Sequence, residues 1–480
     1  MLGELDGALR RRGSFEAIID LTAIEQVIDH WATIHPHLRD GGAFVHPVAN
    51  RSSARRARAW SRGLAHHDDP RIVAMTGPVH SRRGVVMVQK RGTDHLAVGY
   101  AEVDELLRER SEPLQVDVFA ELPAGSHRHR AIVTSHPVDL EVPALDEHLD
   151  HPAQRLRHYQ GRVVVAPGSL VYTEHMVLPD SFRHYAWARL TGRATKSMPG
   201  FVRLDRKRRP QEHLQGDFYL LDAFYPGHFG HHMTETISRL WGWDEAKRRL
   251  PGLKALMTRR PGDDRAETFE RRTFEAYGIG ADDLVEVRHP VEVDSLVAAP
   301  NLWHNQRPHF AHPVLVDTWR RIGDTLAVAP DQPVDRLFVS RRETKRGVHN
   351  LRDVEDYFVR HGFTVVHPED FSVGRQAGLF QEARVIAGIA GSGMFNLAFA
   401  RRLERLIVLS SDSYTARNEH LFSALLGGRL DYFWSTADIP HPPGQWTQEA
   451  FKSPWTFDFP RHGAALDAVM SELPTEVADT

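Results

Sequence analysis

The sequence predicts an α/β protein in which two Rossmann-like domains face each other across a cleft, with a small N-terminal α/β module before them. Apolar strands alternate with amphipathic helices over residues 160–328 and again over residues 329–480, and this alternation is typical of parallel sheets. A proline-bearing hinge at residues 328–335 separates the two series. The length of 480 residues suits two or three domains, and 41% hydrophobic residues can supply their cores.

Residues 1–110 are expected to form the small α/β module. Thr22 is placed to cap the first helix of its strand–helix pattern. The expected elements are strands at 15–21, 38–45 and 85–90, helices at 22–31 and 100–110, and an exposed basic helix or loop at 49–70. Residues 111–159 carry prolines at 113, 123, 137, 143 and 152, so we predict a linker with some extended pairing.

The first large domain is expected over residues 160–328 and begins with a β-hairpin at 162–172. Its further elements are predicted as strands at 218–221, 255–257, 284–287 and 291–296 and helices at 231–241, 244–249, 267–277 and 312–326. The second, over residues 329–480, has predicted strands at 337–340, 363–366, 384–387, 405–409 and 430–433 and helices at 353–361, 372–382, 393–400 and 416–426. The Pro- and Trp-rich tail from residue 440 is expected to pack back across the domains.

The stretch from Arg384 to Ala400 contains the first candidate binding site. An apolar run leads into glycines 388, 391 and 393, and an apolar helical period resumes after them, which predicts a strand, a tight turn and a helix N-terminus. Backbone N–H groups at such a turn, together with the helix dipole, suit a phosphate group that glycines allow to approach closely. The spacing is neither G-x-G-x-x-G nor a P-loop, so a plain turn in an α/β domain is the alternative.

A second anion-binding feature follows the strand predicted at 337–340. That strand ends in the hydroxyl of Ser340 and the guanidinium groups of Arg341 and Arg342, and Lys345 and Arg346 come next. Ligands of open parallel sheets sit at strand ends, and guanidinium groups match phosphate oxygens in bidentate geometry. Two such features, each at a strand end, predict one diphosphate site.

A candidate acid–base pair lies at a loop-to-helix junction in the first domain. His231 and Glu235 are one helical turn apart on one face, and Arg239 continues the same stripe. A carboxylate next to an imidazole orients it and favours its protonated form, which suits proton transfer. A helix cap or a satisfied buried pair is the alternative. A metal site of His228, His231 and His232 is a weaker one, because their spacing matches no common zinc pattern.

These motifs resemble glycosyltransferase family 61, which includes bacterial capsular-polysaccharide enzymes and eukaryotic xylosyl- and N-acetylglucosaminyltransferases. The resemblance is carried by Ser340-Arg341-Arg342, by Asn350, by HGFTVVHPEDFSVGRQAGLFQEARVIAGIAGSGMFNLAFA at residues 361–400, and by FGHHMTE at residues 229–235. It spans roughly Arg162 to Trp434. Two positions depart from the family pattern: Ala390 stands where His is usual, and His232 stands where Trp is usual.

The resemblance implies a GT-B fold and an inverting transfer of a hexose or pentose from a nucleotide-sugar donor to a glycan, lipid-linked or other hydroxyl acceptor. The pathway implied is the biosynthesis of capsular polysaccharide or another glycoconjugate. His231 and Glu235 are the predicted catalytic residues. The predicted donor-binding residues are Ser340, Arg341, Arg346, Gly391, Ser392, Gly393, Asn396 and Glu419. Glu419 is assigned to the donor ribose, with Asn418, His420 and Asp412 as alternatives. We expect no metal and no cofactor, because arginines and a helix dipole can stabilise the leaving diphosphate.

The run LRDGGAFV at residues 38–45 resembles the back half of a methyltransferase domain, in which L-x-x-G-G-x-F-V is common. A glycine-rich loop for the methyl donor would have to precede it, and the sequence contains none there. We therefore expect residues 1–110 to be a degenerate Rossmann fragment rather than an active methyltransferase.

The composition argues against several classes of function. A net charge of −3, from 60 basic and 63 acidic residues, argues against a global attraction to nucleic acid or membrane. The arginine run at residues 55–58 is interpreted as a solvated face, and His127 and His129 as surface residues. The absence of cysteine excludes disulfides and thiolate chemistry. No run approaches ~18 apolar residues and no signal-peptide pattern is found, so we expect a cytoplasmic protein that at most touches a membrane peripherally.

The alternative to an enzyme is a catalytically weak relative that binds an anionic ligand or partner without turnover. Ala390 and the additional N-terminal module favour this alternative. One structural expectation separates the two hypotheses: in an enzyme, His231, Glu235, Arg341 and the turn at residues 388–393 converge on one site.

Overall fold

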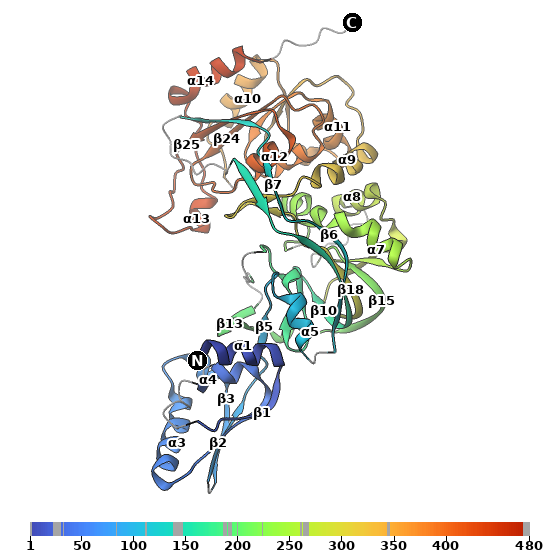
Figure 1. Ribbon diagram of the computed structural model, residues 1–480. Helices are drawn as coiled ribbons and strands as arrows, with labels where there is room; N and C mark the ends of the chain where they lie inside the picture. The colour runs from blue at the N-terminus through green and yellow to red at the C-terminus, as the bar shows by residue number, and fades with distance from the viewer. Residues whose placement is uncertain are drawn as a thin grey trace.

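Three main sheets, of four, eleven and six strands, follow one another along the protein in the computed structural model (Figure 1). The structure describes residues 2–22, 30–31, 33–82, 84–110, 113–137, 147–185, 190, 194–198, 200–222, 224–259, 262, 268–342 and 346–473. The described residues form helices together with several sheets, so the α/β class is confirmed.

The N-terminal module is a mixed four-stranded sheet in the order β1-β2-β4-β3. Its elements are α1 (Leu2–Arg12), β1 (Phe15–Ile19), β2 (Leu38–Pro47), α3 (Arg51–Gly63), α4 (Pro70–Met75), β3 (Thr76–Arg82) and β4 (Val85–Lys90). Only β1 and β2 run parallel, since β4 is antiparallel to both of its neighbours. Trp31 packs against Phe44 and Trp60 in its core. The predicted strands and the basic helix are confirmed, whereas the helix at 22–31 falls mostly outside the described residues.

The central sheet combines an antiparallel and a parallel part. Its strands are β5 (His95–Ala97), β6 (Gln115–Leu122), β10 (Gln154–Ala166), β11 (Leu170–Tyr172), β12 (Met176–Val177), β13 (Ala194–Met198), β14 (Phe201–Leu204), β15 (Glu212–Leu220), β16 (Lys254–Thr258), β17 (Leu284–Val287) and β18 (Val291–Ala298). β10 and β11 form the predicted hairpin. Parallel pairing links β18, β15, β16 and β17, so the expected parallel sheet of this half is limited to the part from β15 onward. The helices α7 (Trp243–Arg249), α8 (Phe269–Tyr277) and α9 (Leu315–Leu326) belong to this half.

The segment predicted as a linker, residues 111–159, is instead woven into both large sheets. β6 pairs with β10 of the central sheet, and β8 (Ile132–His136) pairs with the C-terminal sheet. Between and beside them, β7 (Gly125–Arg128) pairs with β9 (His148–His151). Figure 1 shows this teal segment running from the central sheet to the C-terminal one. β5 and α5 (Val103–Glu109), placed by prediction in the N-terminal module, also pack into the central domain, because the apolar faces that cover them lie there.

The C-terminal sheet is parallel, in the order β22-β21-β23-β24-β25-β8. Its other elements are β21 (Arg336–Val339), α10 (Leu351–Arg360), β22 (Thr364–Val366), α11 (Val373–Glu382), β23 (Val385–Ile389), the 3-10 helix η9 (Ser392–Phe399), β24 (Arg405–Ser411), α12 (Asn418–Leu426) and β25 (Arg429–Ser435). The chain leaves β21 for β22 and then returns past β21 to β23. This doubly wound order has its switch point between β21 and β23.

The two large sheets share one apolar core rather than being joined by a flexible hinge alone. Trp303 and Trp319 from the central half pack against Phe422 of α12, with ring centroids 4.6 and 5.1 Å apart. The described part of the tail packs on the C-terminal sheet: Trp455 forms bridges with Val348 and Ala437, and α14 (Phe459–Ser471) adds to the core there. The expectation that the tail crosses both domains was therefore wrong for this part.

Candidate active site

The first half of the candidate site lies at the switch point of the C-terminal sheet. β21 ends directly before Ser340 and Arg341, and β23 ends directly before the glycine-rich turn. Ligands of doubly wound sheets bind beyond the carboxyl ends of the strands at such a point. The two sequence features predicted to bind a diphosphate therefore lie on neighbouring strands, as expected.

Gly391 and Gly388 are required for different physical reasons. Gly391 has a φ of 139°, which side chains rarely tolerate, and its N–H donates to Glu419 Oε1 at 2.9 Å. Gly388 is required for packing, since a Cβ there would stand 2.6 Å from the sulfur of Met394 and from the Val339 carbonyl oxygen. η9 then begins at Ser392. The strand, turn and helix start are confirmed, and the Gly391 N–H already donates to the carboxyl group of Glu419.

Two arginines stand over the turn. A Cβ on Gly391 would be 2.9 Å from Arg346 Nη2 and 3.8 Å from Arg341 Nη1. The Arg341 guanidinium donates to the Ala390 carbonyl oxygen at 3.5 Å, and that of Arg346 lies 4.6 Å from the Tyr414 ring centroid. Both positive charges are thus held where a phosphate on this turn would sit.

The polar groups of Ser340 and Asn396, predicted to bind the donor, form hydrogen bonds within the fold, and their contact with a donor stays a prediction. The Ser340 hydroxyl donates to Glu355, and Asn396 Nδ2 donates to Gln376 Oε1 at 2.8 Å and to the Gly393 carbonyl oxygen at 3.1 Å. Ser340 thus ties β21 to α10, and Asn396 ties η9 to α11. Their contacts support the turn structurally, because the side-chain directions are set by the helices that pack on the sheet.

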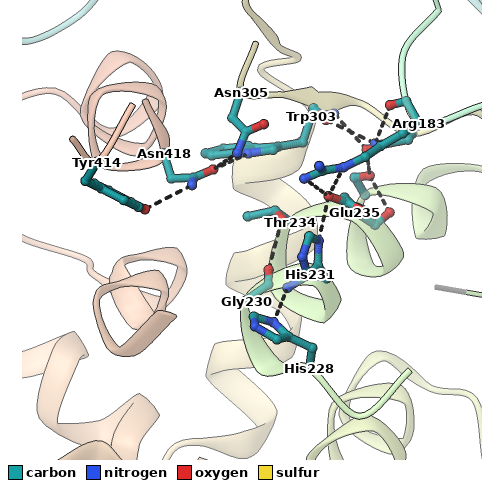
Figure 2. Close-up of polar contacts among 12 residues, drawn as sticks. Arg183, His228, Gly230, His231, Thr234, Glu235, Trp303, Asn305, Tyr414 and Asn418 are labelled. Atoms are coloured by element: carbon teal, nitrogen blue, oxygen red, sulfur yellow. Dashed lines mark hydrogen bonds and ion pairs between the residues drawn. The ribbon is translucent and has the colours of Figure 1, made fainter. Parts of the chain in front are cut away.

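The second half of the site is the pair formed by His231 and Glu235. Nδ1 of His231 lies 2.8 Å from Glu235 Oε1, and the two side chains are 21% and 4% exposed. His228 accepts the His231 backbone N–H and packs its ring against the His231 ring (Figure 2). The helix is not the regular α-helix predicted over 231–241: one α-turn, Phe229–His231, leads into a π-helix at His232–Thr236 and a 3-10 helix at Ile237–Gly242. π-turns are frequent at functional sites.

Arg183 completes this pair and was not singled out from the sequence. Its Nε and Nη2 donate to the same Glu235 Oε1, at 2.7 and 2.6 Å (Figure 2). Oε2 of Glu235 is buried and has no hydrogen-bond partner among the described residues. Arg183 is separated from Glu235 by 52 residues, so no local spacing could have indicated the contact.

The electrostatics keep Glu235 ionised. Burial alone would raise the pKa of its carboxyl, but the positive charges of Arg183 and His231 and their hydrogen bonds hold that pKa below its ordinary value. A carboxylate acceptor at Nδ1 selects the neutral imidazole tautomer with hydrogen on Nδ1. The Nε2 lone pair of His231 is then the basic position.

His232 and Arg239 do not belong to this arrangement. Nε2 of His232 lies 2.6 Å from Thr273 Oγ1 in the core behind the helix, where burial lowers the pKa of the imidazole to about 3. Arg239 is buried against the Ala299 and Asp180 carbonyl oxygens, because the π-turn rotates the helix after Glu235. His228, His231 and His232 therefore do not converge, and no metal-holding group of three or more His, Asp or Glu occurs within the described residues.

The two halves of the site meet directly. A Cβ on Gly230, the residue before His231, would stand 2.9 Å from Ser392 Oγ and 3.0 Å from the Phe395 ring. The helix that carries His231 is thus seated against the start of η9, next to the turn over which Arg341 and Arg346 stand. The hypothesis of an enzyme, unlike that of a binding relative, predicts that His231, Glu235, Arg341 and the turn converge on one site.

A polar contact beside the site also joins the two sheets. Trp303 Nε1 and Asn305 Nδ2 each donate to Asn418 Oδ1 at 3.0 Å, and Asn418 Nδ2 reaches the Tyr414 hydroxyl at 3.4 Å (Figure 2). Tyr414 is the residue under the Arg346 guanidinium. Asn418, one of the alternatives to Glu419, is therefore engaged in holding the two halves together.

Glu419 lies fully buried behind the turn. Burial raises the pKa of its carboxyl to about 7, although the hydrogen bond from Gly391 N–H and the charges of Arg346 and Arg417 act in the opposite direction. His420, another alternative, is buried beside Tyr432, with ring centroids 4.8 Å apart, and Asp412 accepts the Ala437 N–H at 3.0 Å. Glu419 is thus the carboxyl at the turn, and its contact with a ribose stays a prediction.

Glu419 should make the stability of the protein depend on pH. Its folded-state pKa of about 7 exceeds the ordinary 4.5, so its contribution is fully present below about pH 4.5 and is lost as pH rises through 7. In Glu419→Gln the amide oxygen can still accept the Gly391 N–H. We expect the free energy of unfolding of wild type, relative to this variant, to fall by about 3 kcal/mol between about pH 5 and pH 8. Denaturant unfolding at both pH values measures this, and a constant difference would contradict it.

A comparison with known protein families finds a match that includes part of the candidate site. Residues 229–407 match the family model of glycosyltransferase 61. The match begins at the FGHH motif and ends within β24, so it includes His231, Glu235, Arg341, Arg346 and the turn, but neither Arg183 nor Glu419. It is narrower than the resemblance predicted over residues 162–434. No curated protein matches the chain. The match supports family 61 and a glycosyltransferase role, and with it a donor and an acceptor substrate.

Within the parts of the chain that the structure describes, no helix has both the length and the apolar character needed to cross a membrane.

Proposed function

We propose that the protein transfers a sugar from a nucleotide-sugar donor to a hydroxyl acceptor by single displacement with inversion. The observation that carries this proposal is the seating of the His231 helix against the glycine-rich turn, through Gly230 and Ser392. A base and an anion site within one interface are the two parts that such a transfer needs.

In the proposed reaction the acceptor oxygen forms a bond with the anomeric carbon while the bond from that carbon to the donor diphosphate breaks. Nε2 of His231 takes the proton of the acceptor hydroxyl, and Glu235 stabilises the resulting imidazolium. Arg341 and Arg346 stabilise the negative charge that grows on the departing diphosphate. In this scheme the two arginines stabilise the charge of the diphosphate, and no metal ion is required.

Several finer points belong to the same proposal. The sheet order and the residues at the switch point support a GT-B arrangement with the donor on the C-terminal half and the acceptor on the central half. Synthesis of a capsular polysaccharide or another glycoconjugate in the cytoplasm is the proposed setting. The identities of the sugar, the nucleotide and the acceptor are left to experiment.

Thermal shift with UDP-, GDP-, dTDP- and CMP-sugars tests the proposal on wild type and on Arg341→Ala. A ligand at about 100 times its Kd adds roughly 2.7 kcal/mol to the free energy of unfolding. We expect one nucleotide class to raise the melting temperature of wild type and to have little effect on the variant. Arg342→Ala is the matched control, since Arg342 pairs with Asp370 on the surface. A chain that responds to none of these donors would instead fit a relative without turnover, with Ala390 as the first position to examine.

A further inference from the structure

The two carboxylate oxygens of Glu235 differ in the number of hydrogen-bond donors that they contact. Three donors reach Oε1, namely His231 Nδ1 at 2.8 Å and Arg183 Nε and Nη2 at 2.7 and 2.6 Å, while Oε2 has no partner among the described residues. The imidazole and the guanidinium therefore share one oxygen. Any change in the charge of one of them is felt by the other through that atom.

The backbone that carries Arg183 is fixed to the helix that carries Glu235. Asn301 Nδ2 donates to the Arg183 carbonyl oxygen at 3.4 Å, and Asn301 Oδ1 accepts from Ser238 Oγ at 2.8 Å. Ser238 lies one turn after Glu235, and its hydroxyl also lies 2.7 Å from the Glu235 carbonyl oxygen. The guanidinium thus approaches the carboxylate from a rigid frame, with 32% of its side chain exposed.

We propose that Arg183 is a positioning residue that keeps Glu235 an ionised acceptor for His231 Nδ1–H and opposes uptake of a second proton by the His231–Glu235 pair. The buried carboxylate would otherwise have a single donor and a strong tendency to hold a proton itself. Its partner imidazole would also gain a proton more readily without a neighbouring positive charge. This role of Arg183 matters for catalysis only on the basis of the proposed sugar transfer.

The protonation of His231 can be followed without any substrate. Diethyl pyrocarbonate acylates the neutral imidazole, so the pH dependence of acylation at His231, read by peptide mass spectrometry on the ligand-free protein, reports the pH at which the ring gains a proton. We expect the midpoint for Arg183→Gln to lie about one pH unit above that of wild type, because the positive charge that shares Glu235 Oε1 with the imidazole has been removed. Arg183→Lys restores the positive charge and should bring the midpoint most of the way back to that of wild type.

Two further variants make the result decisive. Glu235→Gln should move the midpoint in the opposite direction, because the imidazolium loses its carboxylate. Arg384→Gln removes another arginine–carboxylate pair, with Asp335 at 2.6 Å, and should leave His231 unchanged. An unchanged midpoint in Arg183→Gln would overturn the inference, and if that variant does not fold, a midpoint in Arg183→Lys far from that of wild type would do so. A shifted midpoint in a protein that binds no nucleotide sugar would retain the inference and reject the proposed function.

Discussion

Replacing His231 by Asn is expected to lower the rate of sugar transfer by about 10²–10⁴-fold while donor binding persists. A positioned general base contributes about this factor, and Asn cannot accept the acceptor proton. The proposed donor site consists of other residues, Arg341, Arg346 and the turn, so the thermal shift with the donor should remain. Release of nucleotide from the donor identified in the screen measures the rate, with water as acceptor if no sugar acceptor has been found.

His228→Asn is the matched control for this variant. His228 packs its ring against His231 and accepts the His231 backbone N–H as a helix cap, a role in which Asn is equally effective. The control should therefore retain most of the activity. Similar losses in both variants would mean that the helix start, rather than the His231 base, limits the reaction.

Replacing Gly391 by Ala is expected to weaken donor binding about tenfold or more. The φ of 139° at this residue places a side chain in a strained backbone region, at a cost of about 1–3 kcal/mol. The new Cβ would also stand 2.9 Å from Arg346 Nη2 and displace that guanidinium from the turn. A loss of 1.4 kcal/mol in binding free energy corresponds to a factor of about ten in Kd.

Gly393→Ala is the internal comparison for the turn. A Cβ at that position would meet Val339 Cγ1 at 3.3 Å and Pro368 Cγ at 3.5 Å, which a small side-chain adjustment can relieve. Titration of both variants with the nucleoside diphosphate of the identified donor separates the effects. Equal affinities for wild type and Gly391→Ala would exclude this turn as the phosphate site.

Much of the candidate site could be predicted because its signals are local. His231 and Glu235 meet since residues one helical turn apart share a face, and this holds even though the helix widens into a π-turn between them. Arg341 and the glycine-rich turn were predicted from apolar runs that end in polar or glycine residues. Such runs identify buried parallel strands and their ends from the sequence alone.

Other residues could not be assigned locally. Asn396 was expected at the donor, but its direction depends on where α11 packs against η9. The contact of Glu419 with a ribose stays a prediction, while its hydrogen bond from the Gly391 N–H joins the start of α12 to the turn after β23 and could not be derived from local spacing. Arg183 was missed because 52 residues separate it from Glu235.

The sequence by itself determined the α/β class, the order of strands and helices in the C-terminal half, and the residue types of the candidate base and the candidate anion site. These depend on hydrophobic periodicity and on spacings within a few residues. The tertiary structure alone decided that β8, within the predicted linker, joins the C-terminal sheet, that Gly230 seats the helix of His231 beside the turn, and that Arg183 contacts the same oxygen of Glu235 as His231. Such contacts arise from the packing of segments far apart in the chain, which local patterns do not encode.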